Sequence, residues 1–204
     1  ITLDILHQLV HDFESSVRKT IAENIAEWPE LPVEMAIFLA NAEIEVAYPI
    51  LSKSGVLEDE ALVEVIHQRT MEHQLAIAIR QSVSTDVSDA LVESGHEEVI
   101  SKLLENGNAS ISEKTMEYLV DEAERVDSFR EPIIRRDDLN PKLAQRLYLW
   151  VSAALRKAIT DKYDLDENLI DDLLEKSAVQ TFAKLVSAGS KQRKSDLLAD
   201  ELID

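Results

Sequence analysis

Five segments of this chain can be laid over one another, and this internal repeat restricts the fold more than any other feature. The first copy reads V-R-K-T-I-A-E-N at 17–24. In each copy, apolar residues recur four and five positions after the start, which places them on one side of a helix. The aligned positions are Val17, Val46, Gln74, Val99 and Phe129, then at +4 Ile21, Ile50, Ala78, Leu103 and Ile133, and at +5 Ala22, Leu51, Ile79, Leu104 and Ile134.

A second periodic segment lies between the copies and predicts a second helix in each unit. Apolar residues dominate its first position and the positions at +4 and +8, which form one stripe. These positions are Leu31, Leu57, Val83, Ile111 and Leu139, then Met35, Ala61, Val87, Thr115 and Leu143, then Leu39, Val65, Leu91, Leu119 and Leu147. Two short helices cannot bury both stripes alone, so the units are expected to stack. The sequence therefore predicts an all-α fold, an α-solenoid of about five short helix-pair repeats. A helical bundle with chance internal similarity is the alternative.

Three parts are predicted along the chain. Residues 1–160 form the helical repeat domain, which begins with a helix at 2–11 from an incomplete first unit. Residues 161–188 form a C-terminal capping helix. Residues 189–204 form a linker and an acidic amphipathic tail.

Proline and glycine positions predict where the helices begin and end. Pro49 and Pro132 share one column and are expected in first turns, where a missing N–H costs nothing. No helix breaker follows Pro141 up to Ile159, so this stretch predicts one long helix with Trp150 on its buried side. Each glycine follows a periodic run, where a left-handed helix cap is expected. The glycines are Gly55, Gly95, Gly107 and Gly189.

The chain is strongly acidic, with 40 Asp and Glu residues against 21 Lys and Arg residues and a net charge of −19. This charge argues against nucleic acid as a partner. Basic residues gather at 125–157. They either pair with neighbouring acids such as Glu131, Asp137 and Asp138, or form a docking patch for an acidic or phosphate-bearing partner. The cluster comprises Arg125, Arg130, Arg135, Arg136, Lys142, Arg146, Arg156 and Lys157.

The sequence offers few residues for chemistry. It has no cysteine, so disulfides and thiolate metal sites are excluded. No G-x-S-x-G, P-loop or G-x-G-x-x-G motif is present. His7 and His11 have a spacing that could hold one metal ion, with Asp4 and Glu14 in support, but such a pair is far more often solvated. No apolar run is long enough to span a membrane. A cytoplasmic protein is expected, with sequence missing before Ile1.

The first-helix segments resemble known helical repeats. The segment at 17–24 and the run I-E-V-A-Y-P-I-L-S-K-S-G-V at 44–56 resemble the signatures of the leucine-rich-repeat-variant and HEAT-like α-solenoid families. Residues 1 to about 160 resemble more closely a family of uncharacterised, mainly alphaproteobacterial HEAT-like proteins, through D-V-S-D-A-L-V-E-S-G at 86–95 and R-L-Y-L-W-V-S-A-A-L-R at 146–156. This resemblance implies a fold, but it implies no activity and no catalytic residues.

We expect a non-enzymatic scaffold or adaptor without cofactor or metal, which presents its second helices to a protein or peptide with a basic stretch. Two alternatives stay open. One is a small anionic ligand, or an enzymatic activity, in a groove near the Arg130–Arg146 cluster, which requires a cleft where two or more arginines converge. The other is a homo-oligomer formed through the N-terminal end. The candidate partner-binding residues are Glu34, Glu60, Glu64, Asp86, Asp89, Glu117, Arg130, Arg135, Arg136, Lys142 and Arg146.

Overall fold

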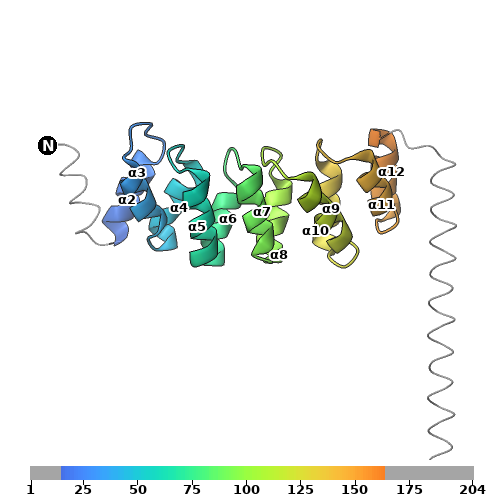
Figure 1. Cartoon of the computed structure of the whole chain (residues 1–204), viewed down its shortest axis with the longest axis horizontal. Helices are drawn as coiled ribbons and strands as arrows, with labels where there is room; N and C mark the ends of the chain where they lie inside the picture. The colour runs from blue at the N-terminus through green and yellow to red at the C-terminus, as the bar shows by residue number, and fades with distance from the viewer. Residues whose placement is uncertain (1–14, 164–204) are drawn as a thin grey trace, which may run out of the picture. The chain divides into compact units, whose positions relative to one another are not determined.

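The computed structural model describes residues 15–163, and all the helices and strands named in that range are α-helices (Figure 1). This confirms the all-α prediction for the described residues. The predicted helix at 2–11, the tail at 189–204 and nearly all of the predicted capping helix lie outside them. The helices are α2 (Ser15–Ile25), α3 (Val33–Ala40), α4 (Ile44–Lys53), α5 (Asp59–Gln68), α6 (Met71–Ala78), α7 (Thr85–Glu93), α8 (Glu97–Glu105), α9 (Glu113–Glu122), α10 (Asp127–Arg135), α11 (Pro141–Tyr148) and α12 (Ala153–Tyr163).

The chain divides into two compact units, Ile1–Leu139 and Asn140–Asp204. In the first unit, the first helices of the predicted copies pack against one another in chain order. Thus α2 contacts α4, α4 contacts α6, α6 contacts α8 and α8 contacts α10, and Figure 1 shows them side by side. The aligned apolar positions supply buried side chains for these contacts, including Leu51, Leu103 and Ile133.

Three positions of the apolar columns are not buried, and one of them, Ile21, is half-buried. Ile79 is 44% exposed because α6 ends at Ala78 and Ile79 is its C-terminal cap. Val17, in the first described helix, is also exposed. The third copy is therefore shorter than the column predicts.

Each second helix packs against the first helix that follows it in the chain. The pairs are α3 with α4, α5 with α6, α7 with α8 and α9 with α10. The connections within these pairs are short: α5 ends at Gln68 and α6 begins at Met71. Each compact hairpin thus joins the second helix of one predicted unit to the first helix of the next unit. The apolar stripe of the second helices is confirmed at its last position, since Leu39, Val65, Leu91 and Leu119 are all buried. At earlier positions Ala61, Ile111 and Thr115 are only half-buried.

Pro49 and Pro132 lie inside their helices, so their predicted place in first turns is wrong. Each is the sixth residue of its helix, α4 or α10. A proline at that position removes one helical hydrogen bond and leaves the carbonyl four residues earlier without its donor. Those carbonyls belong to Glu45 and Ser128, which are both exposed residues. Solvent at these two residues reduces the cost of the lost bonds.

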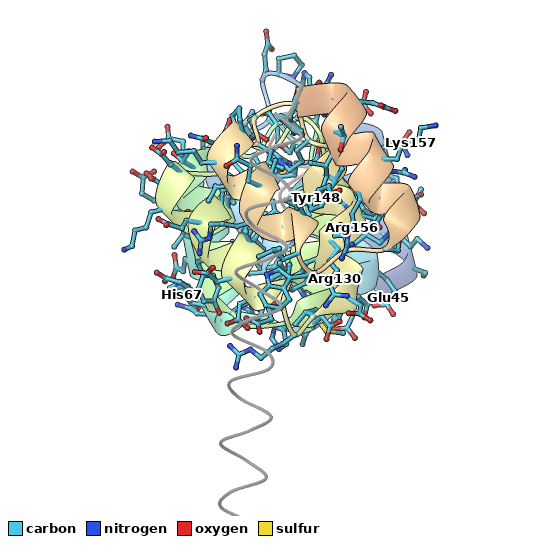
Figure 2. The ribbon with its side chains drawn as sticks, turned by 90° about the vertical axis from the view of Figure 1, so that its right-hand side faces the viewer. Glu45, His67, Arg130, Tyr148, Arg156 and Lys157 are labelled. Atoms are coloured by element: carbon cyan, nitrogen blue, oxygen red, sulfur yellow. The ribbon has the colours of Figure 1, made fainter. Side chains whose placement is uncertain are left out.

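The single helix predicted from Pro141 to Ile159 is also wrong. In the second unit α11 ends at Tyr148 and α12 begins at Ala153, and the two helices contact each other. Trp150 lies in the connection and is 38% exposed, so it does not belong to the core. The Arg156 side chain lies over the Tyr148 ring, 5.3 Å from its centroid, and Arg156 Nε donates to the Tyr148 carbonyl at 3.1 Å (Figure 2).

Polar side chains near the ends of the first helices tie each helix to the one before it. The Arg80 guanidinium, which is 9% exposed, donates to the carbonyls of Leu51 and Ser54 at the end of α4. Asn106 Nδ2 donates to the carbonyls of Ala78 and Arg80 at the end of α6, at 2.9 and 2.8 Å. These are carbonyls that a helix end leaves without an intrahelical donor.

Arg136 repeats this arrangement one helix later. It is 5% exposed, and its Nη atoms donate to the carbonyls of Asn106 and Ala109 at 3.0 and 2.6 Å, beyond the end of α8. The carboxylate of Asp138 accepts from the same guanidinium. We call Arg80, Asn106 and Arg136 the carbonyl ladder.

We predict that Arg80→Met lowers the free energy of unfolding by about 3 kcal/mol, because two buried carbonyls lose their donors. The control Arg125→Met replaces an exposed arginine, paired with Glu122 at 2.6 Å, and should cost no more than about 0.5 kcal/mol. Urea unfolding followed by circular dichroism measures both. Equal losses in the two variants would contradict a structural role for Arg80.

Among the glycines that the structure describes, Gly95 has a positive φ, which is 72°. It follows α7, so the predicted left-handed cap is confirmed there. The same prediction is wrong for Gly55 and Gly107, because the residues before them, Ser54 and Asn106, cap α4 and α8 in extended conformations. Gly189 lies outside the described residues.

We predict that Gly95→Ala costs about 1 kcal/mol of unfolding free energy, because alanine is strained at positive φ. A Cβ at Gly95 or at Gly107 would meet no atom within 4 Å, so the two sites differ in backbone conformation rather than in space. Gly107→Ala should be neutral or slightly stabilising. The difference in urea midpoints between the variants measures the effect, and a Gly107→Ala loss as large as that of Gly95→Ala would refute it.

Candidate functional site

Acidic side chains are concentrated on three second helices of the first unit, α5, α7 and α9, whereas the second helix α3 carries one acid, Glu34. The helices α5, α7 and α9 together carry ten carboxylates and one lysine, Lys114. The first helices α4, α6, α8 and α10 carry seven carboxylates and four basic residues. Because α5 contacts α7 and Asp89 of α7 bonds to α9, we call these three helices the acidic layer. Its carboxylates are Asp59, Glu60, Glu64, Asp86, Asp89, Glu93, Glu113, Glu117, Asp121 and Glu122.

Most of the predicted acidic contact residues are exposed. Glu34, Glu60 and Asp86 are each the second residue of a helix, and no described residue forms an ion pair with them. Glu64 is exposed and accepts a hydrogen bond from Gln68 Nε2 at 3.0 Å. Glu117 is exposed on α9. These carboxylates are therefore accessible to a partner.

Asp89 differs from the other predicted acids because it holds the start of α9. Its Oδ1 accepts from Thr115 Oγ1 at 2.6 Å and lies 3.2 Å from Ser112 Oγ. Ser112 is the N-cap of α9, and its hydroxyl accepts from the Thr115 N–H. The half-buried Asp89 therefore joins α7 to α9.

We predict that Asp89→Ala lowers the free energy of unfolding by about 2 kcal/mol, since hydrogen bonds to a charged acceptor are lost. Asp86→Ala, on the same helix, should cost about 0.5 kcal/mol through the loss of a first-turn acid. Chemical denaturation of both variants provides the measurement. Equal losses of unfolding free energy in the two variants would contradict the role of Asp89 in joining α7 to α9.

The residues of the basic cluster that lie in the first unit are paired with the protein's own acids. In the first unit Arg130 pairs with Asp127, Arg135 with Glu131 and Arg136 with Asp138. Cavities of about 410 and 330 Å³ are both lined by Arg135 and Arg136. The two arginines thus approach the same cavities, but their guanidinium groups already have carboxylate partners, as the first of the two interpretations of this cluster expects. Lys142 and Arg146 belong to the second unit.

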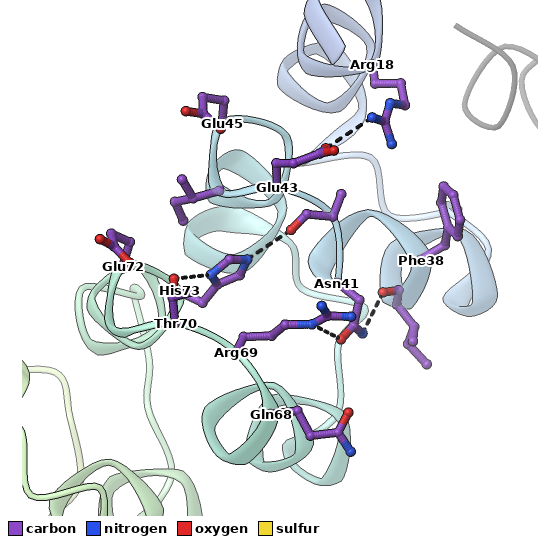
Figure 3. A pocket seen from close by; sticks show the side chains of 13 residues that line it. Arg18, Phe38, Asn41, Glu43, Glu45, Gln68, Arg69, Thr70, Glu72 and His73 are labelled. Atoms are coloured by element: carbon purple, nitrogen blue, oxygen red, sulfur yellow. Dashed lines mark hydrogen bonds and ion pairs between the residues drawn. The ribbon is translucent and has the colours of Figure 1, made fainter. Parts of the chain in front are cut away.

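A cavity of about 980 Å³ lies between the α3–α4 and α5–α6 hairpins (Figure 3). The Arg69 side chain borders it, and Arg69 Nε donates to Asn41 Oδ1 at 2.9 Å. Asn41 Nδ2 donates in turn to the Ile37 carbonyl at 2.9 Å. Arg18 Nη2 lies 3.0 Å from Glu43 Oε2 at the same cavity.

His73 is a buried wall residue of this cavity, 4% exposed. Its Nε2 donates to the Ala42 carbonyl at 3.0 Å, and its Nδ1 lies 3.0 Å from Thr70 Oγ1. The Thr70 hydroxyl lowers the pKa of the Glu72 carboxyl, with the Glu72 backbone N–H and nearby His73 acting in the same direction. His73 therefore joins the two hairpins.

Neither Arg69 nor His73 could be identified as a site residue from the sequence. A repeat alignment reveals apolar columns, but the partners of Arg69 and His73 lie 28 and 31 residues away. Within residues 15–163, no group of three or more metal-binding side chains is placed to hold an ion. His7 and His11 lie outside that range. None of the helices described combines the length and apolar character needed to cross a bilayer.

Comparison with known proteins identifies a family. Residues 46–203 match a family described as "Uncharacterised protein conserved in bacteria (DUF2336)". No curated protein and no solved structure matches the chain. The match agrees with the resemblance to an uncharacterised bacterial family.

Proposed function

The chain belongs to the bacterial family DUF2336, and we propose that it is a non-enzymatic scaffold or adaptor whose acidic layer binds a basic segment of a protein partner. We further propose that its helix pairs form a HEAT-like α-solenoid. The observation that carries the function is the separation of charge between first and second helices.

The order of helix contacts supports the solenoid. Each first helix in the first unit contacts the first helices before and after it in the chain, as far as the described residues extend. Repeat proteins of this type are built from such neighbour contacts, and they leave extended surfaces for binding.

The distribution of bases supports the acidic layer as a binding surface. The first helices neutralise part of their own charge, as Arg135 does with Glu131 in α10 and Lys102 with Glu105 in α8. The helices of the acidic layer carry one lysine for ten carboxylates, so the layer has a net negative charge, and Glu60, Glu64 and Asp86 are exposed on it. A surface of one sign speeds the encounter with a partner of opposite charge and favours it over others.

Helix stability alone does not account for this layer. Acids in the first turn, such as Glu60 and Asp86, stabilise a helix by about 0.3–1 kcal/mol. An acid in the last turn, such as Glu93 of α7, has the opposite effect, and α7 has no basic residue in its last turn. Such a late acid favours a role in binding.

We predict that the double variant Glu60→Lys/Asp86→Lys binds octalysine on the order of tenfold more weakly than the unchanged chain at low salt, because two exposed charges are reversed in the layer. Fluorescence anisotropy of a labelled octalysine, measured in about 20 mM and about 300 mM NaCl, gives the affinities. Binding should weaken as salt rises.

The matched control is Glu45→Lys/Glu98→Lys. These acids are also exposed second residues of their helices, in α4 and α8, and the change in net charge is the same. The control should retain most of the binding. Equal weakening in both double variants would show that total charge, rather than the acidic layer, attracts the peptide, and affinity independent of salt would also count against the proposal.

The expected cytoplasmic location and the expected self-association through the N-terminal end stay predictions, because no described residue bears on either.

A further inference from the structure

We propose that Arg69 binds a peptide carboxylate of the protein partner in the cavity between the α3–α4 and α5–α6 hairpins. This inference rests on the proposed function, because it assigns a second contact to the same partner. The acidic layer would bind the partner's basic stretch, and Arg69 would bind an acidic side chain or a chain terminus next to it.

Arg69 stands apart from the other arginines of the first unit. No described carboxylate pairs with it, although it is exposed and the chain has 40 acidic residues. The buried Arg80 donates to carbonyl groups instead. The remaining described arginines of this unit each pair with a carboxylate; they are Arg18, Arg125, Arg130, Arg135 and Arg136.

The Arg69 guanidinium is held in place before any ligand arrives. Asn41 Nδ2 donates to the Ile37 carbonyl, which fixes the Asn41 amide so that its Oδ1 faces Arg69 Nε (Figure 3). Only Nε takes part in this bond, so the two Nη groups of Arg69 are left for a ligand. Two parallel N–H donors match the two oxygens of a carboxylate.

The charges around the cavity favour a carboxylate over a phosphate. Glu43, Glu45 and Glu72 also line it, against the guanidinium groups of Arg18 and Arg69. Arg18 is already paired with Glu43. A phosphate dianion would meet stronger repulsion from these acids than a carboxylate with a single charge. Phe38 and Ile44 offer apolar contact for a neighbouring side chain.

The cavity adjoins the acidic layer through α5. Gln68 lines the cavity and donates to Glu64, one helical turn earlier on the same helix. A peptide with a basic stretch beside an acidic residue can therefore reach the layer and Arg69 together. A free small anion could not contact the acidic layer and Arg69 at the same time, so we assign the carboxylate to a peptide.

The test is an NMR titration of the ¹⁵N-labelled full chain with N-acetyl-Glu-Phe-amide, which lacks basic residues and so reports on Arg69 alone. We expect saturable shifts of the Arg69 Nε–H and of the backbone N–H groups of Asn41 and His73. N-acetyl-Gln-Phe-amide, which has the same shape without the charge, should bind at least about tenfold more weakly.

Arg69→Gln should abolish the shifts at Asn41 and His73, whereas the control Arg125→Gln, at another exposed arginine, should leave them unchanged. Asn41→Ala removes the group that orients Arg69 and should weaken binding by less than Arg69→Gln. The amide spectrum of each variant shows whether it is folded. Equal binding of the Glu and Gln peptides, or unchanged binding by Arg69→Gln, would overturn the proposal.

The same NMR titration is repeated with sodium acetate and with sodium phosphate. If either gives the same shifts at the same concentration as the Glu peptide, the site binds a free anion and the assignment to a peptide is overturned. Octalysine binding to the acidic layer is measured separately. If octalysine does not bind, the proposed function is wrong. The difference in binding between the Glu and Gln peptides would still show whether Arg69 forms a carboxylate site.

Discussion

Contact between successive first helices is the constraint on which the first unit depends. Its helices are 8 to 11 residues long, and isolated helices of that length are marginal in water. Their stability must come from burial of the aligned column, in which Leu51, Leu103 and Ile133 have almost no exposed surface. Each such side chain contributes about 1.5–3 kcal/mol when fully buried. The apolar column recurs in the sequence because each first helix is stabilised by the same kind of contact with its neighbours.

Short helices create a second requirement, because each one ends in carbonyls without donors. The carbonyl ladder meets it where α4, α6 and α8 end against their neighbours. A guanidinium is suited to this place because it offers several N–H donors and a positive charge near the negative end of a helix. Burial lowers the pKa of Arg80 from its ordinary value, with nearby Asp59 opposing the shift. Arginine nevertheless stays protonated, since its ordinary pKa lies far above neutrality.

The sequence predicted the features that arise from local periodicity. Leu39, Val65 and Leu91 were placed in the core from spacing alone, and their burial agrees. The break after Tyr148 was missed because residues 149–152 contain neither glycine nor proline. Arg136 was placed in a surface cluster, yet its acceptors include carbonyls 27 to 32 residues earlier. Such contacts follow from how the helices stack, and a sequence pattern does not specify them.

The same distinction separates the acids and bases of the candidate site. The charge of α5 and α7 could be predicted because it follows from composition and helical spacing, but the role of Asp89 required the position of Thr115 on another helix. Arg69 becomes informative only after the partners of the other arginines are known. In a chain with 40 acids, an exposed arginine without a carboxylate partner is not explained by a shortage of acids. Its position beside Asn41 keeps the guanidinium facing a cavity, which distinguishes it from the exposed Arg125, whereas Arg135 also lines cavities but is paired with Glu131.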